Sequence, residues 1–199
     1  MVRATDTDGT AEAPGKPDEA LLCAYAAGDP AAARAMAERF GPAAFRFALR
    51  LTGSRADAED VAQEAMIRLY RAAPGWRPGT ARVTSWLYRV IANLATDLAR
   101  RRPTEAIEAA LDLADGAPGA EARLIARDRA DALSRALGTL PDRQRIAVVL
   151  RHIEGLTNPE IAAIMEIGTE AAESLTARGK RALTEALAKD RQALGYAEG

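Results

Sequence analysis

The segment 157–175 constrains the fold of this 199-residue chain more than any other part of its sequence. Thr157 or Asn158 can cap a helix, and Pro159 suits the first turn of that helix because its missing N–H would be unpaired there. Apolar residues follow at helical spacing, and Gly168 then interrupts them. We expect Gly168 to supply the unusual backbone angles of a tight turn.

A second helix is expected directly after this turn. Thr169 can cap it, and Ala172, Leu175 and Leu183 continue its inward face. The segment therefore predicts a helix-turn-helix, in which the second helix normally enters the DNA major groove and presents its early residues to base edges. The alternative is a plain helical hairpin within an all-α domain.

The rest of the chain predicts further helices. Apolar residues recur at helical spacing, and neither β-type alternation nor a repeat of solenoid length appears. We expect four helices in the first half, near 18–27, 30–52, 55–73 and 83–102. The tripeptide at 52–54, Thr-Gly-Ser, can end the second of these helices and cap the third.

These features predict an all-α fold of two small helical domains joined by a flexible acidic linker. We expect a disordered tail over 1–17, a first domain over 18–102, the linker over 103–121, a second domain over 122–189 and a tail over 190–199. The linker has five acidic and no basic residues, with Gly and Pro near its end.

The ordered set of segments resembles the extracytoplasmic-function (ECF) group of bacterial RNA polymerase sigma factors, within the sigma-70 family. Segments 57–72 and 85–102 are similar to regions 2.2 to 2.4 of that group, and 140–157 is similar to the start of region 4. The match covers roughly 18–102 and 122–188. The resemblance implies a factor that binds core RNA polymerase and directs promoter-specific transcription initiation.

The helix near 55–73 carries an acidic stripe, because its acidic residues are three or four positions apart. In the family, this helix docks on the clamp helices of the polymerase β′ subunit, and the resemblance also implies a contact with the β flap. The residues predicted to bind core polymerase are Asp57, Asp60, Gln63, Glu64 and Arg68. The alternative is an ordinary solvated helix surface.

Charge is distributed unevenly along the chain. The net charge is −1, yet residues 20–102 contain 13 arginines against 7 acidic residues, a balance of +6 that suits attraction to phosphates. A solvated charged face is the alternative for any single arginine. By resemblance, this part contacts the non-template strand of the −10 promoter element. The predicted −10 residues are Gly79, Thr80, Arg82, Ser85, Arg89, Asn93, Arg100 and Arg101.

The second helix of the helix-turn-helix is expected to contact the −35 element. Family members commonly have Lys or Arg near the positions of Glu173 and Leu175, and this chain departs from that pattern with an acidic helix start. Glu173 can still accept a hydrogen bond from cytosine N4. The predicted −35 residues are Arg143, Arg145, Thr169, Glu170, Glu173, Ser174, Thr176, Arg178, Lys180 and Arg181.

Other classes of protein fit less well. The sequence has no Gly-rich phosphate loop, no metal-spaced His/Cys set and no nucleophile with a plausible base, so we expect neither an enzyme nor a cofactor. No apolar run approaches ~20 residues and no signal peptide is evident, so a cytoplasmic protein is expected. The lone Cys23 is expected to be a small buried hydrophobe without a disulfide.

Two other regulatory proteins remain as alternatives. A stand-alone helix-turn-helix transcriptional regulator would bind duplex DNA as a symmetric dimer, which leaves the segment 57–102 unexplained. The second alternative is a sigma-like protein that is retained for binding another regulator. The resemblance also implies an anti-sigma factor as a partner, contacting both domains.

Overall fold

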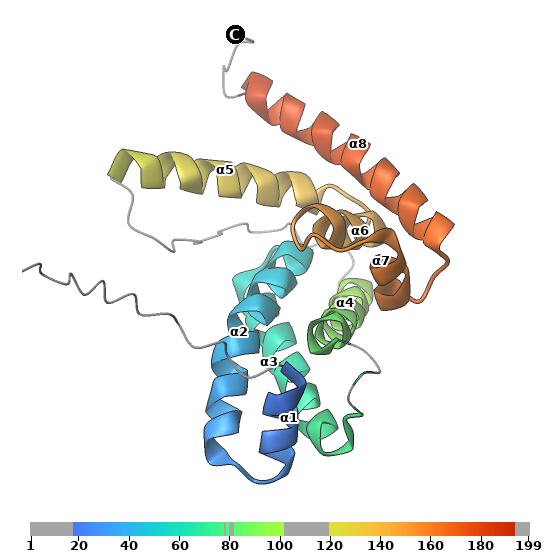
Figure 1. Ribbon diagram of the computed structural model, residues 1–199. Helices are drawn as coiled ribbons and strands as arrows, with labels where there is room; N and C mark the ends of the chain where they lie inside the picture. Colours follow the sequence, from blue (N-terminus) through green and yellow to red (C-terminus); the bar gives the residue numbers. More distant parts are fainter. Residues whose placement is uncertain (1–17, 78, 80–81, 102–119, 194–199) are drawn as a thin grey trace, which may run out of the picture.

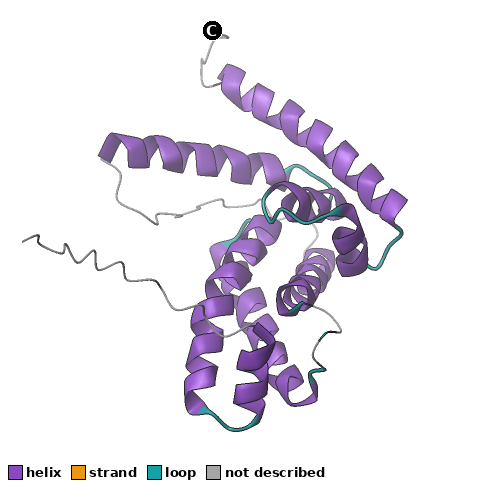
Figure 2. Ribbon diagram, viewed as in Figure 1, coloured by secondary structure: helices purple, strands orange, loops and turns teal. Residues whose placement is uncertain are grey.

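The computed structural model describes residues 18–77, 79, 82–101 and 120–193, and the elements in these residues are all helical (Figures 1 and 2). The elements are α1 (Asp18–Ala26), α2 (Pro30–Thr52), α3 (Arg55–Ala72), a 3-10 turn η1 (Ala73–Gly75), α4 (Val83–Arg101), α5 (Ala120–Gly138), α6 (Asp142–His152), α7 (Asn158–Met165) and α8 (Thr169–Ala193). The all-α prediction is confirmed. None of these helices is both long and apolar enough to cross a membrane.

Some predicted segments fall on residues that the structure does not describe. These are the tail over 1–17, most of the linker over 103–121, residues 194–199 of the last tail, and Thr80 of the proposed −10 set.

Local capping sets the boundaries of α2 and α3. The Asp29 carboxylate accepts a hydrogen bond from the Ala31 N–H at 2.9 Å, at the start of α2. Gly53 ends that helix in the left-handed region, with φ of 68°, and the Ser54 hydroxyl accepts from the Asp57 N–H at the start of α3. The helix boundary predicted at 52–54 is therefore confirmed.

Helices α1 to α4 pack around an apolar core. On α3, the apolar residues Val61, Ala65 and Leu69 are spaced four apart and are buried. Phe47 of α2 packs on Tyr88 of α4 with ring centroids 4.6 Å apart. These contacts join the three longer helices of this half. The opposite face of α3 points outward, and part of the opposite face of α4 contacts α7.

Cys23 is exposed, so the prediction that it is buried was wrong. Leu21 and Leu22 form the buried side of α1, and one further residue along a helix turns the side chain by about 100°. Cys23 therefore points to the solvent side.

Helices α7 and α8 form the predicted helix-turn-helix, with α6 packed against both. Ile161, Ile164 and Ala172 are buried where the helices meet. The turn differs from the prediction, because Glu166 and not Gly168 has the left-handed backbone, with φ of 54°. Helix α7 ends directly before Glu166, so the left-handed residue that caps the helix falls there.

The two halves of the chain pack directly on one another. Helix α2 contacts α5 and α6 of the second half, and α4 contacts α7 (Figure 1). The buried apolar residues of both halves belong to one continuous cluster. The helix-turn-helix is therefore held against the first four helices in this arrangement.

Gly179 provides a test of the packing between α6 and α8. A Cβ at this position would lie 2.5 Å from Val148 Cγ2 and 2.9 Å from the Gln144 carbonyl oxygen. We expect Gly179→Ala to destabilise the chain by up to about 2 kcal/mol, because overpacking costs about 1–3 kcal/mol and the gain in helix propensity returns only ~1 kcal/mol. Urea denaturation measures the change. Gly168→Ala is the control, since its Cβ would meet nothing within 4 Å, and an equal loss in both variants would contradict the packing argument.

Candidate nucleic-acid interface

Helix α4 carries a polar stripe opposite its buried face. The stripe contains Arg82, just before the helix, and then Arg89, Asn93 and Arg100, at spacings that bring them to one side. Ser85 lies beside the stripe and is half-buried, whereas Asn93 and Arg100 are exposed. The buried face of the helix includes Leu87 and Ile91. Most of the proposed −10 residues therefore lie along one side of α4, because of their spacing in the sequence and the geometry of the helix.

Gly79 and Arg101, also in the proposed −10 set, lie beyond the stripe. Gly79 has φ of 81°, and its N–H donates a hydrogen bond to Glu19 Oε1 at 3.0 Å. Arg101 is the last residue of α4 and is exposed. Both are accessible from solvent.

The stripe contacts α7, the first helix of the helix-turn-helix. Arg82 Nη1 lies 3.4 Å from Glu160 Oε1, and Arg89 Nη2 donates a hydrogen bond to the Ala163 carbonyl at 3.1 Å. Arg89 also lies 3.7 Å from the Glu166 carboxylate. The backbone and hydroxyl hydrogen bonds from Thr157 lower the pKa of Glu160, which keeps that carboxylate charged opposite Arg82. Two arginines proposed for DNA therefore contact α7 of the same chain, although the Arg82 side chain is 77% exposed.

The acidic stripe of α3 points away from the core. Asp60, Gln63 and Arg68 are exposed, and Glu64 accepts a hydrogen bond from Arg68 Nε at 2.8 Å. Asp57 is half-buried in the first turn, where its N–H bonds the capping Ser54 hydroxyl. An exposed pair such as Glu64–Arg68 contributes only a few tenths of a kcal/mol to stability. The five residues proposed for polymerase binding therefore lie on one accessible side of the helix.

Helix α8 buries Ala172, Thr176 and Gly179, so the opposite side faces solvent. The exposed members of the proposed −35 set on this helix are Thr169, Glu170, Glu173, Ser174, Arg178, Lys180 and Arg181. Glu173 Oε1 accepts a hydrogen bond from Asn158 Nδ2 of α7 at 3.2 Å, which orients the carboxylate. Its second oxygen remains an acceptor for a base edge.

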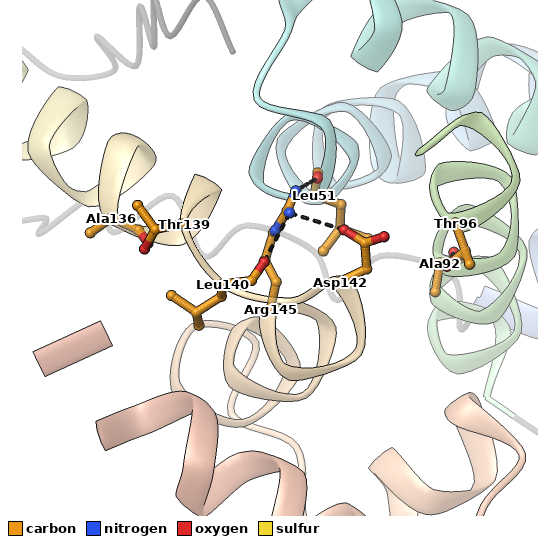
Figure 3. Close-up of polar contacts among 8 residues, drawn as sticks. All are labelled: Leu51, Ala92, Thr96, Ala136, Thr139, Leu140, Asp142 and Arg145. Carbon is orange, nitrogen blue, oxygen red and sulfur yellow. Dashed lines mark hydrogen bonds and ion pairs between the residues drawn. The ribbon is translucent and has the colours of Figure 1, made fainter. Parts of the chain in front are cut away.

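Thr176 and Arg145, both in the proposed −35 set, are occupied within the protein. The buried Thr176 hydroxyl donates to the Ala172 carbonyl at 2.8 Å. Arg145, 11% exposed, bonds the Leu51 carbonyl at the end of α2, the Leu140 carbonyl and the Asp142 carboxylate (Figure 3).

Burial lowers the pKa of Arg145, although the nearby Asp142 charge opposes that shift. In this arrangement, neither Thr176 nor Arg145 is free to reach DNA. Arg143, two positions before Arg145 on α6, is exposed.

The sequence analysis missed a polar cluster between the two halves. Glu154, in the loop before α7, accepts hydrogen bonds from Arg50 of α2 at 3.1 Å and from the Tyr88 hydroxyl of α4 at 2.5 Å. Burial and the hydrogen bond to Glu154 raise the pKa of Tyr88, so the hydroxyl stays protonated and donates. The partners of Glu154 are 104 and 66 positions away in the sequence, so no short-range residue spacing predicts the cluster.

Comparisons with known proteins agree with this geometry. The family model for sigma-70 region 2 matches residues 36–104, which include α3 and α4, and the model for sigma-70 region 4 matches residues 130–183, which include the helix-turn-helix. The region 2 match thus includes the stripes of α3 and α4, and the region 4 match includes most of α8.

Individual relatives carry the same regions. The ECF RNA polymerase sigma factor SigE of Mycolicibacterium smegmatis is 38% identical over 149 residues, which are 73% of this chain and 57% of SigE. The ECF RNA polymerase sigma factor SigM of Mycobacterium tuberculosis is 32% identical over 173 residues, which are 85% of this chain and 84% of SigM. The chain belongs to the ECF family of RNA polymerase sigma factors.

Solved structures have the same fold. CnrH, solved in complex with the cytosolic domain of CnrY, superposes with a TM-score of 0.65 at 25% identity, covering 87% of this chain and 98% of that chain. The sigma factor RpoE of Bartonella quintana, solved with the anti-sigma factor NepR, gives a TM-score of 0.64 at 22% identity, covering 79% and 98%. The arrangement of helices is therefore one that sigma factors adopt.

Arg145 and Arg143 allow a test of which arginine supports the fold. We expect Arg145→Ala to lower the free energy of unfolding by roughly 2–4 kcal/mol, because it leaves buried acceptors without their charged donor. Arg143→Ala, on the same helix but exposed, should change stability by less than about 0.5 kcal/mol. Urea denaturation compares the two variants, and similar stabilities would contradict the structural role of Arg145.

Proposed function

We propose that this chain binds core RNA polymerase and directs promoter-specific transcription initiation. The observation that carries the proposal is the order of three surfaces on one chain: the acidic stripe of α3, the arginine and asparagine stripe of α4, and the exposed side of α8 in the helix-turn-helix. The match of this order to sigma-70 regions 2 and 4 supports the assignment.

The proposed role of α4 is to hold the melted −10 element. Unstacking and unpairing bases costs a few kcal/mol per step, and a sigma factor must recover this free energy by binding the opened strand. Arg82, Arg89 and Arg100 supply positive charge along one line, which suits the phosphates of a single strand. The Asn93 amide has both donors and an acceptor for a base edge.

The proposed role of α8 is to bind the −35 element in the major groove. Its first turns present Glu170, Glu173 and Ser174, and Glu173 can accept a hydrogen bond from cytosine N4. Arg178, Lys180 and Arg181 are proposed backbone contacts, as is Arg143 of α6. Arg145 and Thr176 are left out of this interface, because both are engaged inside the protein.

Two protein partners complete the proposal. The acidic stripe of α3 is the proposed contact for the β′ clamp helices, and the half containing α5 to α8 is the proposed contact for the β flap. An anti-sigma factor is the proposed regulator, supported by the structural neighbour that was solved with one. A stand-alone regulator would have no use for the α3 stripe, so that function is not favoured.

Run-off transcription tests the proposal directly. Purified bacterial core RNA polymerase is assayed with and without this protein on promoter fragments from the source genome. Specific initiation that depends on the protein is expected, and the start sites would define the −10 and −35 sequences. Binding to core without initiation on any fragment would favour a sigma-like protein that serves another regulator, whereas binding to DNA but not to core would favour a stand-alone regulator.

Charge reversal on α3 tests the polymerase contact. We expect the double variant Asp60→Arg, Glu64→Arg to weaken binding to core by at least about tenfold, because like charges at an interface cost several kcal/mol. Fluorescence anisotropy of labelled protein measures the affinity. The single variant Glu38→Arg is the control for Asp60→Arg alone, because it reverses one exposed carboxylate on α2, outside the stripe. Unchanged affinity in the first variant would remove the clamp assignment.

Truncation on α4 tests the promoter contact separately. We expect Arg89→Ala with Asn93→Ala to reduce open-complex formation by at least about 30-fold, since loss of each side-chain contact to a base costs about 1–3 kcal/mol. Binding to core should stay within about twofold. Permanganate reactivity of thymines measures melting, and Arg34→Ala on the exposed side of α2 is the control. Equal losses of melting and of core binding would count against the promoter role.

A further inference from the structure

The Glu173 carboxylate is held by a side chain from the other helix of the helix-turn-helix. Asn158 is the first residue of α7, and its Nδ2 donates a hydrogen bond to Glu173 Oε1 at 3.2 Å. Glu173 lies in the second turn of α8, which begins at Thr169, and its side chain is exposed. A free glutamate side chain on a helix surface has several rotamers. The hydrogen bond from α7 therefore restricts the direction in which this carboxylate points.

The surroundings of Asn158 fix the orientation of its amide. The Oδ1 atom is buried and has no hydrogen-bond partner among the residues that the structure describes. A reversed amide would place this oxygen against the Glu173 carboxylate, where two acceptors repel each other. A buried acceptor without a partner costs free energy of folding. Stability alone therefore explains Asn158 poorly, and the one hydrogen bond that its amide donates serves to orient Glu173.

No cation lies near Glu173 along its own helix. Side chains three or four positions apart are the ones that pair on a helix surface, and those positions hold Thr169, Glu170, Thr176 and Ala177. The hydrogen bond from α7 uses one oxygen of the carboxylate. The second oxygen is therefore available as an acceptor on the exposed side of α8.

An ionised carboxylate distinguishes bases because it accepts hydrogen bonds and donates none. In the major groove, guanine and thymine present only acceptors to it, whereas adenine N6 and cytosine N4 are donors. Adenine N6 has an acceptor on each side, its own N7 and the O4 of the paired thymine. Cytosine N4 has only the O6 of the paired guanine beside it. Cytosine is therefore the base that such a carboxylate prefers.

The same charge makes Glu173 unsuited to the DNA backbone. Phosphates attract Lys and Arg, and they repel a carboxylate. Glu173 therefore adds no affinity that is independent of sequence, and it weakens binding wherever the base that faces it has no donor.

We propose that Glu173 is a specificity-determining residue that selects a C·G pair in the −35 element, and that Asn158 is the residue that positions it. This inference rests on the proposed function and deepens it, because it takes α8 as the helix that binds the −35 element. The contact acts mainly by excluding the other bases from one position. Its effect is therefore visible in base preference more than in overall affinity.

Selection from random duplex DNA tests the proposal. The full-length protein, tagged and bound to core polymerase, is used to capture duplexes from a random library at constant salt, because affinity depends on salt. The captured duplexes are sequenced. Capture requires binding but no transcription, so the result is independent of run-off activity.

We expect the unmutated protein to prefer cytosine at one position by at least about fivefold over the next base. Glu173→Gln should shift that preference to adenine, because a glutamine amide can pair with both N6 and N7 of adenine. Asn158→Ala should keep cytosine but reduce the preference by at least about twofold, since residues in contact are energetically coupled. Glu185→Gln, at an exposed position near the end of α8, is the control for the loss of a carboxylate and should leave the preference unchanged.

A methylated base tests the same contact at the level of one atom. In a duplex with N4-methylcytosine at the selected position, the methyl group replaces the N4 hydrogen that faces the major groove and leaves Watson–Crick pairing intact. The unmutated protein should bind this duplex at least about fivefold more weakly than the unmethylated one. Glu173→Ala should bind both duplexes equally, because it has no acceptor for that hydrogen.

The outcomes separate this inference from the proposed function. An unmutated protein without a cytosine preference would overturn the inference, and so would the same preference in Glu173→Gln. If run-off transcription succeeds while Glu173→Gln keeps the original preference, the proposed function stands and the inference does not. If the cytosine preference depends on Glu173 while run-off transcription fails, base recognition by Glu173 stands and the proposed function does not.

Discussion

The arrangement of the two halves depends on the apolar cluster that runs through both of them, and the Glu154 carboxylate adds polar contacts at the same junction. This carboxylate accepts from Arg50 of α2 and from the Tyr88 hydroxyl of α4. The Arg50 and Glu154 side chains are both partly buried, so removing one partner leaves a charge that solvent compensates only in part. The helix-turn-helix is therefore held over α4 by this partly buried charge together with the apolar cluster, and Arg82 and Arg89 contact α7 in that position.

This arrangement bears on the proposed role of α4. The Arg89 guanidinium contacts α7 in this structure, so a ligand that binds Arg89 has to compete with the Ala163 carbonyl and the Glu166 carboxylate. Arg82, Asn93 and Arg100 stay exposed along the same stripe.

Local features of the sequence predicted the helices well and some side chains poorly. The boundary at 52–54 was predictable, since a capping residue acts within one turn of its helix. The sequence did not predict that Glu166, and not Gly168, has the left-handed backbone, because this depends on where α7 ends. The sequence alone suggests that Arg145 and Thr176 contact DNA. The packing of α6 and α8 instead gives both side chains hydrogen-bond partners within the protein.

The sequence by itself determined the four helices of the first half, the helix-turn-helix and the family, because helical periodicity, caps and motifs act over a few neighbouring positions. It also placed the stripes of α3 and α4, since residues three or four apart share a helix face. Only the tertiary structure decided how the halves meet. The partners of Glu154 are separated from it by 66 and 104 positions, and contacts at such separations arise from packing and leave no periodic pattern in the chain.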